Sequence, residues 1–242
     1  MTIGVISLLL ALTLPALFRM RRNAEFVRSL ATHREIASSL QLYAADHRGA
    51  FPYFMTEGDP LGPKRLDGFD LPVPYFRAGH VFWPNLVVPD YFSSDLPFFM
   101  AIPPDREAAV ERNLFDGYPP QTIRSRYFMT DTAFAAPEYW ATDDTPSDLG
   151  LLRGTLLSDV RFPANKGLTV DMLTGAFSDR DRDGFVDPDA VPLAAVGLGD
   201  GSARTVPWSD ATHDLSRVVE RPFGALPWPI FSTRGGLAGT DF

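Results

Sequence analysis

Residues 3–49, IGVISLLLALTLPALFRMRRNAEFVRSLATHREIASSLQLYAADHRG, decide the fold, because they predict one long helix with two unlike halves. The first sixteen of them, 3–18, carry no charge and almost no polar side chain, and the run ends at Arg19. This pattern is typical of a membrane anchor, although it covers only roughly 24 Å of a hydrocarbon core of about 30 Å. A cleaved secretory signal and a helix buried in a soluble core stay open as alternatives.

The second half of the predicted helix is amphipathic. Arg48, Gly49 and Pro52 together predict where it ends. We therefore expect a spine helix that packs a head on one face and keeps its charged side chains off that face, with His33 packed as a structural residue. The expected inner stripe repeats every three or four residues and consists of Phe26, Leu30, His33, Ala37, Leu40 and Ala44, widened by Ile36 and Tyr43.

Composition limits the class of protein. The 242 residues are 45% hydrophobic and 21% charged, which is globular, and the 22 prolines and 19 glycines predict many turns. Cysteine is absent, which excludes disulfides, thiolate metal sites and a cysteine nucleophile. Residues 1–48 hold six arginines and three acidic residues, so the rest of a chain of net charge −8 carries about −11. An acidic head of this kind argues against a nucleic-acid partner.

The head reads as a small antiparallel sheet with long loops. Asp200 and Gly201 predict a hairpin turn, and residues 105–114 predict one short helix. We expect the Phe and Trp side chains of the loops to fill a core rather than to bind a ligand. The chain is thus predicted to be α+β, with strands at residues 155–157, 167–170, 194–198 and 203–206.

One segment has the pattern of a calcium loop. Carboxylates alternate at Asp179, Asp181 and Asp183, Gly184 allows a sharp turn, and the Phe185 carbonyl and Asp187 occupy the next ligand positions. Ca²⁺ prefers six or more oxygen ligands, but the position of the usual bidentate glutamate is Ala190, so we expect a weak site. A solvated acidic turn is the alternative. The predicted metal ligands are Asp179, Asp181, Asp183, Phe185 and Asp187.

Catalytic motifs are missing from the sequence. The four histidines are scattered, and neither H-E-x-x-H nor G-x-S-x-G occurs. We therefore expect a protein that is not an enzyme.

Several segments together resemble the prepilin-type proteins, the type II pseudopilin-like family in its planctomycete-type, DG-motif form. The N-terminal segments are Leu14-Pro15-Ala16-Leu17 and YAADHRGAFP at residues 43–52; the head segments are WPNL at 83–86, LSDVRFP at 157–163 and GDGS at 199–202. The family's peptidase recognises a glycine followed by F-T-L-I-E, which would precede the apolar run and is missing here. We expect the explanation to be a true start upstream of Met1.

The resemblance implies a type IV pilin-like fold and a structural role. Residues 1–22 would be the membrane-anchoring half of the helix, 23–49 the spine and 50–242 the head. The chain would be a pilin-like or pseudopilin-like subunit of a type II secretion or type IV pilus-like assembly. It would contact other pilin-like subunits through the N-terminal helix, cross the cell inner membrane once and expose a periplasmic head. The alternative is a membrane-tethered, extracytoplasmic module that binds its target in a calcium-dependent way.

Overall fold

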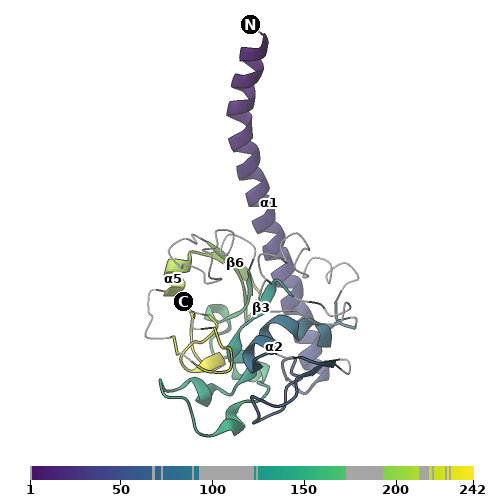
Figure 1. Ribbon diagram of the computed structural model, residues 1–242, viewed down its shortest axis with the longest axis vertical. Coiled ribbons are helices and arrows are strands. Elements are labelled where there is room, and N and C mark those ends of the chain that lie inside the picture. Colours follow the sequence, from purple (N-terminus) through teal and green to yellow (C-terminus); the bar gives the residue numbers. More distant parts are fainter. Residues whose placement is uncertain are drawn as a thin grey trace.

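The computed structural model describes residues 2–66, 69–71, 73–88, 90–92, 123, 125–172, 193–212, 218–219, 221–226, 228 and 230–242. The N-terminal part of helix α1 (Thr2–Asp46) projects from a head that contains a small antiparallel sheet, and the N-terminus lies at the far end of this helix (Figure 1). The expected α+β class is therefore confirmed.

Helix α1 is continuous through Pro15 and ends where the sequence predicts. The Gly49 amide donates to the Ala44 carbonyl at 2.7 Å, and Arg48 (φ 57°) and Gly49 (φ 86°) take left-handed conformations that stop the helix. His33, Ala37, Leu40 and the other C-terminal members of the inner stripe are buried, whereas Phe26 and Leu30 are half-buried where the helix leaves the head. Across the described residues, no helix has both the length and the apolar character needed to cross a membrane.

The main sheet is an antiparallel meander in the order β3-β4-β5-β6. Its strands are β3 (Tyr127–Met129), β4 (Gly167–Asp171), β5 (Ala194–Leu198) and β6 (Ala203–Val206). The last three match the prediction. The predicted turn joins β5 to β6: Gly201 has φ 85°, and the Asp200 carboxylate accepts from the Ser202 amide at 2.9 Å.

The strand predicted at residues 155–157 is wrong. Leu156 forms only an isolated bridge with Ala50, and its amide donates to the Asp159 side chain at 3.0 Å. This capping contact opens the 3₁₀ turn Leu157–Asp159, so the ladder cannot continue.

Both faces of the sheet are covered, which explains why every residue of β4 and β5 is buried. On one face α1 packs mainly on β5 and β6. On the other, helix α2 (Tyr75–Phe82) lies against β3, and His80 stacks on Phe128 with ring centroids 4.8 Å apart. The sequence analysis did not foresee α2, because prolines were taken to predict turns; Pro74 instead stands immediately before the first residue of the helix and makes no side-chain capping hydrogen bond.

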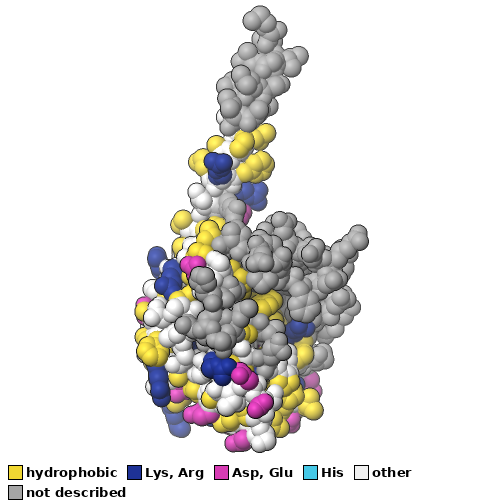
Figure 2. Space-filling view, turned by 90° about the vertical axis from the view of Figure 1, so that its left-hand side faces the viewer, with side chains coloured by type: hydrophobic (Ala, Val, Ile, Leu, Met, Phe, Trp, Pro, Cys, Tyr) yellow, Lys and Arg dark blue, Asp and Glu magenta, His cyan; other side chains and the backbone are white. Residues whose placement is uncertain are grey.

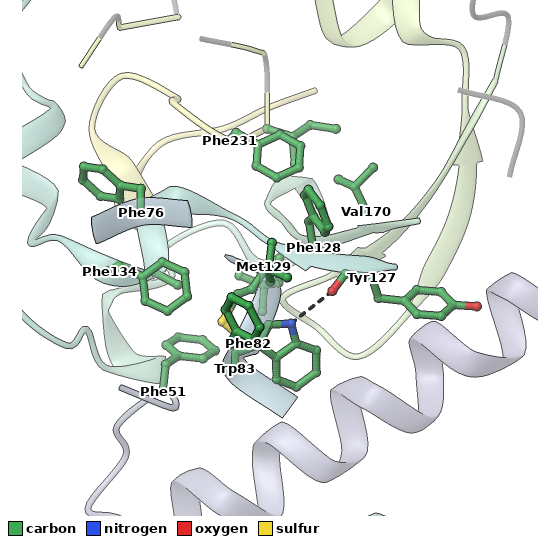
Figure 3. Close-up of a cluster of buried hydrophobic side chains, with 14 of the residues drawn as sticks. Phe51, Phe76, Phe82, Trp83, Tyr127, Phe128, Met129, Phe134, Val170 and Phe231 are labelled. Atoms are coloured by element: carbon green, nitrogen blue, oxygen red, sulfur yellow. Dashed lines mark hydrogen bonds between the residues drawn. The ribbon is translucent and has the colours of Figure 1, made fainter. Parts of the chain in front are cut away.

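Large aromatic side chains fill the space between α2, the sheet and the loops, as expected (Figure 3). Trp83 is fully buried, and its indole Nε1 donates to the Tyr127 carbonyl at 3.0 Å. The remaining described elements are β1 (Arg65–Leu66), β2 (Phe69–Asp70), α5 (Trp208–Thr212) and the 3₁₀ turns Trp83–Leu86, Asp131–Phe134, Pro137–Trp140, Leu149–Leu151, Pro163–Asn165 and Gly236–Ala238. The short helix predicted at residues 105–114 lies outside the described residues.

Candidate assembly interface

The stretch of α1 that projects from the head exposes apolar side chains to solvent. Its described side chains from Thr13 to Arg28 are exposed, apart from the half-buried Phe26. Five large apolar side chains in this stretch are 45–67% exposed: Leu14, Leu17, Phe18, Met20 and Val27. The idea that the apolar run is a buried core helix is therefore wrong for those of its side chains that the structure describes, since no described residue covers them.

Some of these side chains form a regular seam. Spacings of three and four residues relate Leu17, Met20, Ala24, Val27 and Ala31, and all five are exposed. This is the a/d pattern of a heptad repeat, which suits packing against another helix. We call these five residues the outer seam.

A buried ionic cluster fixes α1 to the sheet just below this stretch. Ser29 of α1 donates to Asp171 Oδ2 at 2.5 Å, and Arg126 donates to both oxygens of the same carboxylate at 2.9 and 2.7 Å. The Asp171 side chain is fully buried. Burial disfavours the Arg126 charge, but the charge and the hydrogen bonds of Asp171, together with Tyr127 and Glu25, outweigh burial and raise the pKa of the guanidinium.

One helical turn further on, His33 makes the second attachment. Its Nε2 lies 3.0 Å from the Ala195 carbonyl, which can only accept, so Nε2 carries the proton and the neutral ring accepts from Thr169 Oγ1 at Nδ1, 2.8 Å away. Complete burial lowers the pKa of His33 to about 4, although the nearby Asp171 carboxylate opposes this. The prediction that His33 is a packed structural residue is confirmed. Ser29, His33, Arg126, Thr169 and Asp171 are together called the clamp.

The clamp requires a close approach of helix and sheet at Gly197 of β5. A Cβ atom at this position would lie 2.5 Å from Thr169 Oγ1 and 2.9 Å from His33 Nδ1. Any larger side chain would force α1 and the sheet apart, so Gly197 is needed for the clamp to close.

Charges share the projecting stretch with the apolar side chains, as the space-filling view shows (Figure 2). Arg21 pairs with Glu25 at 3.3 Å, but both side chains are more than half exposed, so the pair contributes little to stability.

Other titratable groups of the head are buried in pairs. His80 Nδ1 lies 2.9 Å from Asp131 Oδ1, and Lys166 Nζ lies 3.1 Å from Asp241 Oδ1. Burial raises the pKa of Asp131 against the attraction of His80, and burial lowers the pKa of Lys166 against that of Asp241. These pairs join segments far apart in sequence, which is a structural role.

The five predicted calcium ligands, Asp179, Asp181, Asp183, Phe185 and Asp187, lie outside the described residues. The chain positions on either side of them are fixed, because β4 ends at Asp171 and β5 begins at Ala194 in neighbouring strands. Within the described part of the chain, no group of three or more His, Asp or Glu side chains is placed to hold a metal ion.

Sequence reasoning missed most of the clamp. A signal was present, since Ser29 and Thr32 are polar residues at positions that the structure buries beside the inner stripe. Polar side chains at buried helix positions need partners, and the partner of Ser29 is Asp171.

Comparison of the chain with protein-family models, with curated proteins and with solved structures gives no match.

Proposed function

We propose that this chain is a pilin-like structural subunit, which assembles with further subunits through α1 and is anchored by residues 1–22 in the cell inner membrane, with the head on the periplasmic side. The observation that carries the proposal is the projecting half of α1, whose described large apolar side chains are exposed and are not covered by any residue that the structure describes. Exposed apolar surface of this kind is typical of association sites.

The arrangement suits a helix bundle of like subunits. The clamp fixes the rotation of α1 about its axis and directs the outer seam away from the head. Ala31 of the seam and His33 of the clamp are two residues apart, which places them about 160° apart around the helix. A neighbouring helix can therefore reach the seam without meeting the head of the same subunit.

Charges beside the seam favour parallel helices. Positions next to the seam carry Arg21 and Arg28 on one side, and Asn23 and Leu30 on the other. In a parallel pair the arginine side of one helix lies against the uncharged side of the other, so each arginine meets an uncharged residue. An antiparallel pair would place arginines against arginines. Parallel packing keeps all heads at one end of the bundle, as a pilus-like assembly requires.

Cysteine crosslinking tests the proposal cleanly, because the chain contains no cysteine. Met20→Cys and Val27→Cys should each give a disulfide-linked dimer under mild oxidation, since equivalent seam positions meet in a parallel pair. Leu61→Cys is the matched control: it is an apolar residue of the head and is 84% exposed. If neither seam variant crosslinks more than the control, assembly through α1 is contradicted. The alternative function, a membrane-tethered binding module, would then be favoured.

The anchor is tested separately. A chain that lacks residues 1–22 should be soluble and folded, because the inner stripe and the clamp begin after this segment. If the shortened chain is unfolded while the full chain is a detergent-free monomer, residues 1–22 do not act as an anchor.

A further inference from the structure

An open groove of about 620 Å³ lies on the head between the loop before β1, the β1–β2 hairpin and the segment at Phe223. This volume is in the range of small-ligand sites. Its described walls are mostly apolar: Pro60, Pro63, Leu71, Val73, Pro74 and Phe223. Three of these six are prolines, whose fixed φ makes the walls rigid before any ligand arrives.

Among the described residues, one cation lines this apolar groove. Lys64 is only 7% exposed, and its ammonium makes no hydrogen bond or ion pair with any residue that the structure describes. The nearest charge acting on it is Asp59, whose attraction is weaker than the effect of burial, so that the pKa of Lys64 is lowered. The stem of Lys64 is buried, whereas its ammonium is not among the buried polar atoms without a partner and so reaches the open groove. An anion that enters the groove can pair with it there, beside apolar walls that weaken its hydration.

The other charged side chain that the structure describes in the groove, Asp70, has an ion-pair partner. Asp70 Oδ1 accepts from Arg65 Nε at 3.0 Å across the β1–β2 hairpin. Among the described residues that line the groove, Lys64 is thus the charged side chain without an ion pair.

The far wall is held in a strained conformation. Phe223 has φ 64°, which is unusual for a bulky residue, and its carbonyl accepts from the Phe76 amide at 3.1 Å. Gly224 beside it has φ 81°, and a Cβ there would lie 2.6 Å from Pro74 Cβ. Strain of this kind is found at ligand sites, where the surrounding structure maintains it.

We propose that this groove binds a carboxylate carried on a small apolar body, with Lys64 pairing with the carboxylate and the proline and Phe223 walls covering the apolar part. The site lies on the head and does not depend on assembly through α1. The ligand is either a free acid or the C-terminal carboxylate of an apolar peptide.

Calorimetry on the full chain tests the proposal with matched probes. 3-Phenylpropionate should bind with a Kd below about 1 mM, and its uncharged amide should bind about tenfold more weakly or not at all, because it cannot pair with Lys64. N-acetyl-leucyl-phenylalanine and its C-terminal amide form the second pair of probes. Preference for the first acid identifies a free acid, and preference for the second identifies a peptide terminus. Equal binding of acid and amide in both pairs, or no binding of either acid, would overturn the proposal.

Variants separate the charge from the groove. Lys64→Met should weaken binding of the acid about tenfold, whereas Arg161→Met, which removes an exposed cation of the head outside the groove, should leave it unchanged. If Lys64→Met does not fold, Asp70→Asn gives the opposite test: it removes the ion-pair partner of Arg65 and makes the groove more positive, so binding of the acid should tighten severalfold, and unchanged or weaker binding would count against the proposal.

Discussion

His33 should make the stability of the head depend on pH, and the size of the effect follows from its burial. In the unfolded chain the imidazole has a pKa of 6.5, whereas in the folded protein the pKa is about 4. Each tenfold change in proton affinity corresponds to about 1.4 kcal/mol, so the whole difference is worth about 3 kcal/mol.

The direction follows from which state binds the proton. Between pH 6.5 and 4, His33 is protonated in the unfolded chain but stays neutral in the folded protein, because the buried charge would be poorly solvated. The stabilising contribution is therefore complete above pH 6.5, is lost as the pH falls towards 4, and stays constant below that. By pH 5 the loss amounts to about 2 kcal/mol.

Urea unfolding followed by tryptophan fluorescence, at pH values from 7.5 to 4.5, measures this effect. Carboxylates also titrate in this range, so the informative quantity is the difference in unfolding free energy between the wild type and His33→Gln. Glutamine can still donate to the Ala195 carbonyl but does not titrate. The difference should shrink by about 2 kcal/mol between pH 7.5 and 5. His47→Gln, at an exposed position near the helix end, should follow the wild-type profile. A wild-type minus His33→Gln difference that is constant with pH would refute the reasoning.

Three further outcomes follow from the structure and the sequence. Arg126→Met should lower the unfolding free energy by about 3–5 kcal/mol, because it leaves the Asp171 carboxylate buried without its cation, and adding Asp171→Asn should recover part of this loss in a double-mutant cycle. Gly197→Ala should cost about 1–3 kcal/mol in the same assay, since its Cβ would meet a side-chain oxygen at 2.5 Å, and wild-type stability would exclude the close approach. Calcium at 1 mM should add about 1.4 kcal/mol if the predicted loop binds it with a Kd of about 0.1 mM, and Asp181→Asn with Asp183→Asn should remove the shift; equal melting temperatures in chelator and in calcium would refute the loop.

The elements that the sequence predicted well are those with local signals. Helix α1 carries a long stripe with a clear end signal at Arg48 and Gly49, and the β5–β6 hairpin combines two apolar runs with the Asp200–Gly201 turn. In both, the residues that determine the structure are neighbours in sequence. Their positions therefore follow from periodicity and turn chemistry alone.

Elements that were missed depend on distant partners. Strand β3 has only three residues and is fixed by pairing with β4, about forty residues away. Helix α2 has eight residues, too few to be stable alone, and exists because the sheet and the aromatic core bury seven of them. The clamp is similar: Ser29 could be noticed as a polar residue in a buried position, but its partner Asp171 is 142 residues away.

The candidate interface was only partly predictable from the sequence, because its orientation depends on the clamp. The apolar character of the N-terminal segment follows from composition, but composition does not determine which side of the helix faces a neighbour. Ser29 and His33 determine that, because each bonds to the sheet and together they allow only one rotation of α1. The outer seam then points away from the head until Arg34, exposed at the next seam position, interrupts its spacing. If the chain assembles through α1 as proposed, weakening the clamp should disturb assembly as well as stability, since a helix free to rotate would no longer present the seam in one direction.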